Sequence, residues 1–142
     1  MGQVDRFPLP AAGEVSLRMS MRRVLIVEDE PDLAWVERFN LEAEGYEVRW
    51  AAEGGAAISA LEDFAPHVVV LDLMLPHVNG WAVLEKAQEL PANRRPTVIV
   101  VSAVAGMEDR MHAEDLGVGH FLAKPFEIED LLRLVREAPQ PA

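Results

Sequence analysis

The sequence predicts an α/β fold in which five parallel strands form one sheet, with helices on both of its faces. Three observations favour this fold. Short uncharged runs of Val, Leu and Ile recur along the chain, as is typical of parallel strands buried on both faces. Segments with a helical spacing of apolar residues alternate with these runs, and glycine or proline separates many of the segments. Such alternation implies right-handed crossovers between parallel strands.

The expected elements, in chain order, are strand 22–27, helix 31–44, strand 46–50, helix 54–64, a strand from Val68, a helix from Asn79-Gly80 to Leu90, strand 97–102, helix 106–116, strand 120–123 and helix 127–137. Pro31 suits the first turn of its helix, and Gly45 suits the stop at the other end. The apolar residues of that helix are only fairly spaced, at Leu33, Val36, Phe39 and Leu41.

The later helices differ in the strength of their patterns. The last one carries apolar residues at i, i+3, i+4 and i+7, namely Ile128, Leu131, Leu132 and Val135. The helix at 106–116 is poorly amphipathic, with Met107, Met111 and Leu116 as its expected anchors. Because few apolar anchors hold it, we expect this helix to move most easily. Trp35, Trp50 and Trp81 are interpreted as packing residues.

Composition limits the class of protein. With 142 residues, 50% of them hydrophobic, and a mean hydropathy of +0.05, the chain can form one globular domain with a real core. The absence of cysteine excludes disulfides and thiolate metal sites. No apolar run is long enough to span a membrane. The net charge of −11 would repel nucleic acid, so we expect no direct nucleic-acid binding.

Four of the expected strands end in a polar group, supplied by Glu28-Asp29, Asp72, Ser102 and Lys124. The carboxyl ends of parallel strands meet at one edge of the sheet, so these side chains should converge. Carboxylates from two strand ends repel each other unless a cation lies between them, and hard oxygen ligands favour Mg²⁺ over Zn²⁺. A lysine and a hydroxyl beside a metal bind phosphoryl groups. A central carboxylate can then accept a phosphoryl group as an acyl phosphate.

Each of these residues also has an ordinary interpretation. Glu28 and Asp29 could serve the N-terminus of the next helix, where anions are favoured. Ser102 could be a loop hydroxyl, and Phe121 could be a core residue. The four histidines, at positions 67, 77, 112 and 120, show no ligand spacing and are interpreted as surface or loop residues.

Four motifs together resemble the receiver domain of two-component response regulators. They are Val24–Glu30, Val70–Pro76 with Gly80, Ser102-Ala103 and Phe121–Phe126. The resemblance covers residues 22–137, and the intervals between the motifs also fit. It implies a doubly wound, flavodoxin-like sheet with strand order 2-1-3-4-5.

The family's roles transfer to matching positions. The resemblance implies that a sensor histidine kinase or phosphotransfer protein phosphorylates Asp72. Asp29, Asp72 and the main-chain carbonyl of Met74 would bind Mg²⁺ directly, with Glu28 assisting through water. Lys124 would contact the phosphoryl oxygens. Ser102 would swing to hydrogen-bond the phosphoryl group, and Phe121 would change rotamer with it.

Two further expectations follow from the resemblance. The Lys124–Pro125 peptide bond should be cis, although only about 5–6% of X–Pro bonds are. Met74 and Val104 are apolar residues that would flank the site, where we expect them to hinder attacking water and to lengthen the lifetime of the phosphoryl group.

Three alternatives stay open. A haloacid-dehalogenase-like phosphatase also uses an aspartate nucleophile and Mg²⁺, but it needs Asp-x-Asp after the first strand, where this chain has Glu28-Asp29-Glu30. A nucleotide- or flavin-binding protein wants a glycine-rich or hydroxyl-rich phosphate loop there. A degenerate receiver would act only as a protein-interaction module. We therefore expect a signalling domain and not an enzyme with a separate substrate.

The domain organisation is expected to be simple. Residues 1–20 are interpreted as a flexible extension, 21–138 as the receiver domain and 139–142 as a tail or the start of a linker. The output would pass to a downstream effector protein or to a missing output domain. We expect a cytoplasmic protein with no membrane partner.

Overall fold

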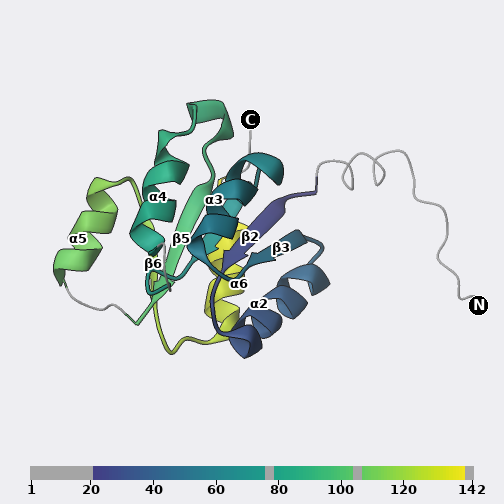
Figure 1. The fold of residues 1–142 in the computed structure, drawn as a ribbon. Coiled ribbons are helices and arrows are strands. Elements are labelled where there is room, and N and C mark those ends of the chain that lie inside the picture. The colour runs from purple at the N-terminus through teal and green to yellow at the C-terminus, as the bar shows by residue number, and fades with distance from the viewer. Residues whose placement is uncertain (1–20, 76–78, 104–106, 140–142) are drawn as a thin grey trace, which may run out of the picture.

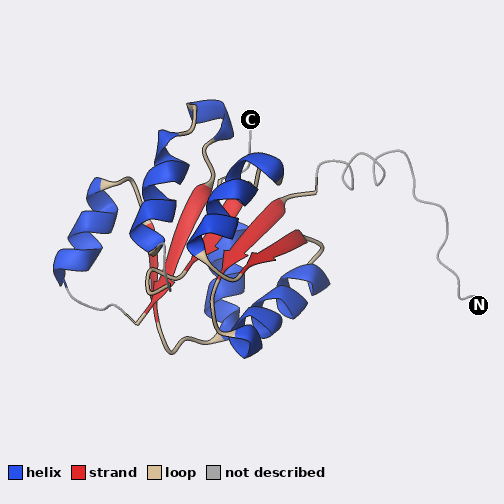
Figure 2. Cartoon of the chain, viewed as in Figure 1, coloured by secondary structure: helices blue, strands red, loops and turns tan. Residues whose placement is uncertain are grey.

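The computed structural model describes residues 21–75, 79–103 and 107–139 (Figure 1). These ranges contain one parallel sheet with helices on both faces (Figure 2). The expected N-terminal extension, Val104 and most of the expected tail lie outside the described residues. Within the described ranges, no helix has the length and apolar character needed to cross a bilayer.

All of the expected elements are present, and their ends differ from the expected ones by about a residue. The strands are β2 (Arg23–Val27), β3 (Glu47–Ala51), β4 (Val68–Leu71), β5 (Thr97–Ser102) and β6 (His120–Ala123). The helices are α2 (Pro31–Ala43), α3 (Gly54–Asp63), α4 (Gly80–Glu89), α5 (Met107–Asp115) and α6 (Ile128–Glu137). A short 3₁₀ helix, η1 (Ala92–Arg94), joins α4 to β5.

The strand order confirms the predicted topology. The sheet runs β3-β2-β4-β5-β6, which is the order 2-1-3-4-5 in the sequence of described strands, and every pairing is parallel. At the centre, Val27 of β2 pairs with Leu71 of β4. The residues that follow these two strands therefore emerge side by side at the carboxyl edge.

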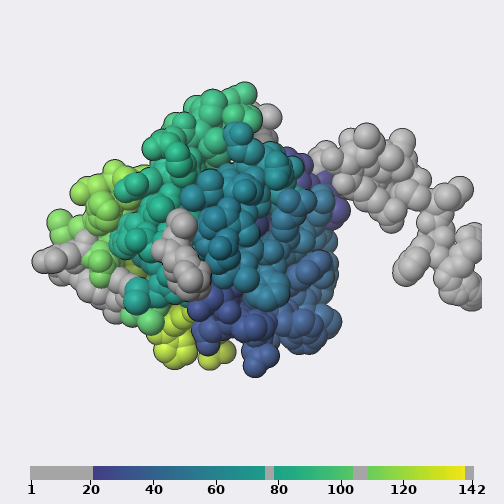
Figure 3. Space-filling view, viewed as in Figure 1, coloured from purple at the N-terminus to yellow at the C-terminus, as the bar shows by residue number. Residues whose placement is uncertain are grey.

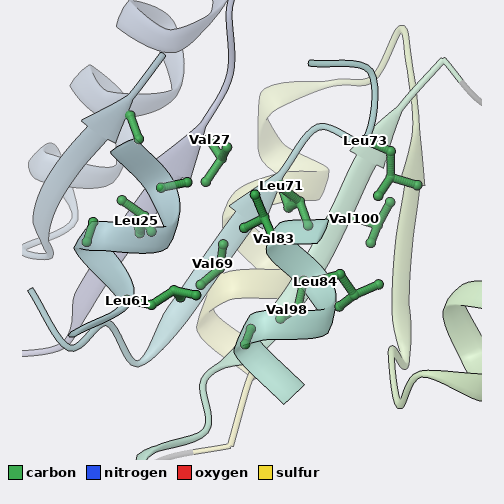
Figure 4. Packing of buried hydrophobic residues seen from close by; sticks show 14 of the residues in the cluster. Leu25, Val27, Leu61, Val69, Leu71, Leu73, Val83, Leu84, Val98 and Val100 are labelled. Atoms are coloured by element: carbon green, nitrogen blue, oxygen red, sulfur yellow. The ribbon is translucent and has the colours of Figure 1, made fainter. Parts of the chain in front are cut away.

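Two apolar layers hold the helices to the sheet. One layer lies between the sheet and the helices α3 and α4, and it contains alternate strand residues such as Val69 and Leu71 (Figure 4). The other layer lies under α2 and α6, with Ile26 and Leu131 at 0% exposure. In the space-filling view, α3 and α4 cover the side of the sheet that faces the viewer (Figure 3). The strands are apolar on both faces because both faces are covered.

Helix ends follow local chemistry. The carboxamide oxygen of Asn79 accepts a hydrogen bond from the backbone N–H of Ala82 at 3.1 Å and so caps the N-terminus of α4. At the end of α2, Gly45 has a φ of +98°, which a residue without Cβ adopts at little cost. The predicted stop at Gly45 is therefore confirmed.

Helix α2 is rotated relative to the expectation from its apolar residues. Its buried residues are Ala34, Glu37 and Leu41, whereas Val36 and Phe39 are exposed. Burial of the small Ala34 side chain lets the helix approach the sheet, and the helical period then carries Glu37 inward. Val36 and Phe39, two of the four apolar residues whose spacing predicted this helix, therefore do not face the core.

The tryptophans behave differently from one another. Trp35 is 64% exposed and stacks on Phe39 with ring centroids 5.2 Å apart, so its interpretation as a packing residue was wrong. Trp81 is half-buried against the core beneath α4. Trp50 is partly exposed, but its indole N–H donates to the carbonyl oxygen of Glu28 at 2.7 Å.

Of the three anchors expected for helix α5, Leu116 is confirmed, Met111 is not, and the side chain of Met107 lies outside the described part of the structure. Met111 is 55% exposed, so its predicted anchoring role was wrong. Ala113 is buried at 1% exposure and Leu116 packs against the core. Ala113 removes little apolar surface from water, so its own contact contributes little stability.

Candidate functional site

The backbone fixes two acidic residues at the carboxyl edge of the sheet. The N–H of Asp72 donates to the carbonyl oxygen of Val27 at 3.0 Å, and the N–H of Glu28 donates to that of Ala51 at 3.1 Å. These bonds extend the ladder of the sheet by one residue. Glu28 and Asp72 therefore sit on rigid strand ends, where their side chains have little positional freedom.

Three carboxylates meet at this edge. One oxygen each from Glu28, Asp29 and Asp72 lie within 4.8 Å of one another. Glu28 is 2% exposed and Asp72 is 4% exposed, whereas Asp29 is exposed to solvent. Two of the three carboxylates are therefore buried, and solvent reaches the cluster at Asp29.

The Lys124 ammonium lies among the acids. Its Nζ is 2.8 Å from Oδ2 of Asp72, 3.0 Å from Oε1 of Glu28 and 3.4 Å from Oε1 of Glu30. The backbone N–H of Lys124 donates to the carbonyl oxygen of Ser102 at 3.0 Å, which fixes the lysine to the end of β5. The Lys124–Pro125 peptide bond is cis.

The ionisation of these groups is coupled. Burial raises the pKa of Glu28, while the hydrogen bond from Lys124 partly opposes this shift. Burial also acts to lower the pKa of Lys124, but the hydrogen bonds and charges of Asp72 and Glu28 outweigh it, so that this pKa is raised. Lys124 is therefore fully charged at neutral pH. One ammonium contacts three acidic side chains, with Asp29 close by, so acidic groups outnumber the cation at this site.

The oxygens of Asp72 have distinct partners. Oδ1 accepts a hydrogen bond from the backbone N–H of Met74 at 2.8 Å, and the hydroxyl of Ser102 lies 3.4 Å from the same oxygen. Ser102 is fully buried at the end of β5. Oδ2 faces Lys124. Each oxygen is thus oriented by at least one donor, which fixes the plane of the carboxylate.

Gly80 packs directly against the backbone that carries Asp72. A Cβ at this position would lie 2.6 Å from the carbonyl oxygen of Asp72, and the N–H of Gly80 donates to the carbonyl oxygen of Leu73 at 3.1 Å. Only a residue without a side chain allows this close approach. The Asn79-Gly80 pair therefore both starts α4 and supports the loop that follows β4.

Phe121 connects β6 to α5. Its position in β6 pairs with Val100 of β5, and its ring is half-buried against the core. The guanidinium of Arg110, on α5, lies 4.8 Å from the centre of this ring. Such a cation–π contact contributes about 0.5–1 kcal/mol when it is exposed. The switch role predicted for Phe121 remains a prediction.

Comparison with known proteins assigns the chain and its fold to a family. The sequence profile of the response regulator receiver domain matches residues 24–136, which is most of the chain. The chain belongs to the response regulator receiver family. The sequence-based assignment to the receivers of two-component systems is thus confirmed.

Receivers from several organisms are similar to this one. The DNA-binding dual master transcriptional regulator RpaA of Synechocystis is 32% identical over 116 residues, which cover 82% of this chain and 48% of RpaA. The transcriptional regulatory protein KdpE of Mycobacterium tuberculosis is 36% identical over 118 residues, which cover 83% of this chain and 51% of KdpE. The chain spans about half the length of most of the curated relatives it matches.

Solved receiver structures have the same architecture. A CheY-like receiver domain protein from Methanospirillum hungatei superposes with a TM-score of 0.77 at 31% identity, covering 82% of this chain and 92% of the other. The receiver domain of the sensor histidine kinase PA1611 from Pseudomonas aeruginosa has a TM-score of 0.73 at 28% identity, covering 83% and 97% of the two chains. The latter structure holds a magnesium ion in its active-site cleft.

The structure of this receiver brings together most of the predicted site residues. Glu28, Asp29, Asp72, Ser102 and Lys124 form one cluster. Met74 contributes its backbone N–H, and its side chain is 63% exposed beside the cluster.

Two acidic residues of this receiver were missed by sequence reasoning. Glu30 contacts Lys124, and the run of three acids at 28–30 was the signal that could have revealed it. Glu37 is buried at 1% exposure, and neither of its carboxylate oxygens has a hydrogen-bond partner among the described residues. No local signal revealed Glu37, because the spacing of the apolar residues does not determine which face of α2 is buried.

Proposed function

We propose that this receiver is phosphorylated on Asp72 and that the modification changes its surface. The single observation that carries the proposal is the environment of Asp72, which is 4% exposed, is 2.8 Å from Lys124 and lies within 4.8 Å of two further acids. A structural carboxylate does not need this surplus of negative charge around it. A nucleophile that works with a divalent cation does.

The reaction transfers a phosphoryl group from a phosphohistidine of a partner protein. A carboxylate oxygen of Asp72 forms a bond to phosphorus while the bond from phosphorus to the histidine nitrogen breaks, and the electron pair of that bond leaves with the imidazole. Lys124 neutralises charge on the phosphoryl oxygens. The N–H of Met74 holds the carboxylate in the orientation that the attack requires.

The donor set fits Mg²⁺. Glu28, Asp29 and Asp72 offer hard oxygen atoms, and this cluster, as far as the structure describes it, contains no cysteine or histidine that would favour a softer metal. Asp29 and Asp72 would hold the ion directly, Glu28 would assist through water, and the main-chain carbonyl of Met74 would complete the protein ligands. A bound Mg²⁺ supplies positive charge that screens the carboxylates from the incoming phosphoryl group.

Ser102 and Phe121 pass the change to α5. The hydroxyl of Ser102 lies close enough to Asp72 to donate to a phosphoryl oxygen after a small displacement. Phe121 sits on the neighbouring strand, and Arg110 joins its ring to α5. Helix α5 buries little apolar surface, so a small differential contact is enough to change its position.

Incubation of the protein with acetyl phosphate and Mg²⁺, followed by intact mass measurement, tests the proposal. We expect one phosphoryl adduct in the wild type and none in Asp72→Asn. The matched control is Asp63→Asn, which makes the same chemical change at an exposed position of α3. Absence of an adduct in the wild type, or its persistence in Asp72→Asn, would refute the proposal.

A receiver that acts only as a binding module is the alternative. Such a protein would not need the complete set of acids, hydroxyl and lysine. A titration with Mg²⁺ monitored by intrinsic tryptophan fluorescence separates the two functions, because the indole N–H of Trp50, one of the three tryptophans, donates a hydrogen bond to the carbonyl oxygen of Glu28. We expect saturable binding that is lost in Asp29→Asn. A response equal to that of the same ionic strength of NaCl would favour the binding module.

The exposed face of α2 is the surface that we assign to the phosphodonor protein. Trp35 and Phe39 are 64% and 57% exposed, Val36 is also exposed, and α2 begins directly after Glu30 at the edge of the site. Aromatic side chains of this kind dominate the energetics of protein interfaces. We expect Trp35→Ala to slow phosphotransfer from the donor protein about tenfold or more, with unchanged phosphorylation by acetyl phosphate.

The output passes to an effector protein or to an output domain on the same polypeptide. Nucleic acid is not the direct partner of this domain, because the net charge of −11 opposes approach to phosphate backbones. We place the phosphorylation in the cytoplasm, where ATP-dependent kinases supply the phosphoryl group.

A further inference from the structure

A cavity with basic residues in its lining lies at the edge of the sheet opposite Asp72. It has a volume of about 530 Å³ and is formed where η1 and the starts of β2 and β5 meet, near the end of α6. This region is at the top of Figure 1, where the chain passes from α4 into β5. The volume lies within the range of about 300–1,000 Å³ that is typical of small-molecule sites. The cavity shares no residue with the acidic cluster.

The charged residues that line this cavity are basic, whereas the protein as a whole is acidic. Arg23, Arg94, Arg95 and His67 line it, and none of the described lining residues is acidic. The chain as a whole carries a net charge of −11. The guanidinium groups of the cavity repel one another at short range, and of these arginines only Arg94 has an acidic partner within the described residues, Glu62, at 3.8 Å. A bound anion would offset this repulsion.

Two of the guanidinium groups are held in place by the backbone. Nε of Arg23 donates to the carbonyl oxygens of Phe64 and Ala65, both at 2.9 Å. Arg95 donates from Nε and from one terminal nitrogen to the carbonyl oxygen of Leu90, at 3.2 and 2.9 Å. These bonds orient both planar groups, and within the described ranges both terminal nitrogens of Arg23 have no protein acceptor. Pre-oriented guanidinium groups match the geometry of phosphate oxygens.

Hydrogen bonds fix the position of His67 beside the arginines. Its ring atom Nδ1 accepts a hydrogen bond from the backbone N–H of Arg23 at 2.9 Å. The backbone N–H of His67 donates to the carbonyl oxygen of Arg23 at 2.8 Å, and the backbone carbonyl oxygen of His67 accepts from the N–H of Thr97 at 2.9 Å. The neutral ring therefore carries its proton on Nε2 and can donate it. Burial, together with the charges of Arg23 and Arg22, lowers the pKa of His67. Of these causes, the positive charges of Arg23 and Arg22 also favour a bound anion.

We propose that this cavity binds a small molecule that carries a phosphoryl group, at a site independent of Asp72. The arginines bind the phosphoryl oxygens, His67 and Thr97 provide further hydrogen bonds, and Ala65 contributes an apolar wall for the remainder of the ligand. A small molecule is favoured over a macromolecule because the basic residues surround a cavity and do not extend as a flat surface. The proposal goes beyond phosphorylation and does not depend on it.

Titrations followed by ¹H–¹⁵N NMR on the full chain test the site. The probes are inorganic phosphate, adenosine monophosphate and adenosine, each at constant ionic strength. We expect saturable shifts in residues 65–67 and 92–97 with both phosphorylated probes, and none there with adenosine. Tighter binding of the nucleotide than of phosphate would identify a phosphorylated organic ligand, and equal binding would identify free phosphate. The imidazole of His67 should also titrate at higher pH when either phosphorylated probe is saturating.

Variants connect the shifts to the arginines. Arg94→Gln and Arg95→Gln change exposed side chains, and each should weaken binding of the phosphorylated probes about tenfold. Arg133→Gln, an exposed arginine of α6 outside the cavity, should leave binding unchanged. The proposal is overturned if phosphate and NaCl cause the same shifts, or if all three variants bind as the wild type does. Unchanged amide spectra elsewhere in each variant establish that it is folded.

Discussion

Glu37 makes the stability of this receiver depend on pH in a way that can be calculated. Burial, reinforced by the charge of Glu28, raises its pKa from 4.5 to about 8, while Lys124 acts in the opposite direction. The folded state therefore holds a proton that the unfolded state releases. At pH 4.5 and below, both states are protonated and little stability is lost. As the pH rises from 4.5 to 8, the free energy of unfolding falls by about 1.4 kcal/mol for each pH unit.

The substitutions Glu37→Gln and Glu37→Leu measure this loss. At pH 7 the proton equilibrium of Glu37 reduces stability by about 3 kcal/mol, which is a large part of the roughly 5–15 kcal/mol of an ordinary domain. Glu37→Gln removes the titration and keeps the shape of the side chain. Glu37→Leu also removes the unpartnered polar atoms, so it should be the more stable of the two variants at every pH.

Urea unfolding at pH 5, 6, 7 and 8, followed by circular dichroism, is the assay. Between pH 5 and pH 8 the wild type should lose roughly 3–4 kcal/mol more than Glu37→Gln, because only the wild type carries this titrating group. Glu85→Gln, at an exposed position of α4, is the control and should follow the wild type. If the difference between wild type and Glu37→Gln stays constant across this range, Glu37 does not titrate with a raised pKa and the reasoning is wrong.

Three further predictions concern the acidic cluster. Lys124→Met leaves two buried carboxylates without their cation and should reduce stability by about 3 kcal/mol, with partial recovery in Mg²⁺, as thermal melts with and without the ion will show. Gly80→Ala introduces a Cβ against the backbone and should cost about 1–3 kcal/mol in urea unfolding, whereas Gly119→Ala enters open space and should cost less than about 1 kcal/mol. Met74→Asn should shorten the lifetime of the phosphoryl group severalfold, because an exposed apolar side chain that excludes water is lost. Loss of the radiolabelled adduct measures this lifetime, and Met111→Asn, an equally exposed methionine on α5, should decay as the wild type does.

Much of the cluster could be predicted because its residues stand at strand ends. An apolar run such as 68–71 is buried on both faces, and the residue that follows it must leave at the carboxyl edge. Parallel strands bring all such residues to one edge. The sequence therefore predicts that Asp72, Ser102 and Lys124 lie together. The triple contact of Lys124 could not be predicted, because the length and flexibility of a lysine side chain allow many positions.

The sequence did not determine which face of α2 is buried against the sheet. A helix with apolar residues around most of its circumference can turn either of two faces toward the sheet, and local spacing does not choose between them. The close fit of Ala34 against the strands decides, and it carries Glu37 inward and Trp35 outward. The basic cavity could not be predicted from the sequence either. Arg23 and Arg95 are far apart in the chain, and only the pairing of the strands brings them to the same cavity.

The order of strands and helices, the acidic edge and the membership of the receiver family were determined by the sequence itself, since each follows from short-range patterns and the geometry of parallel strands. The tertiary structure alone decided which side of α2 is buried, which acids share Lys124 and where the arginines gather. These features depend on the packing of whole elements against each other, and that packing is a property of the assembled volume and not of any local stretch of chain.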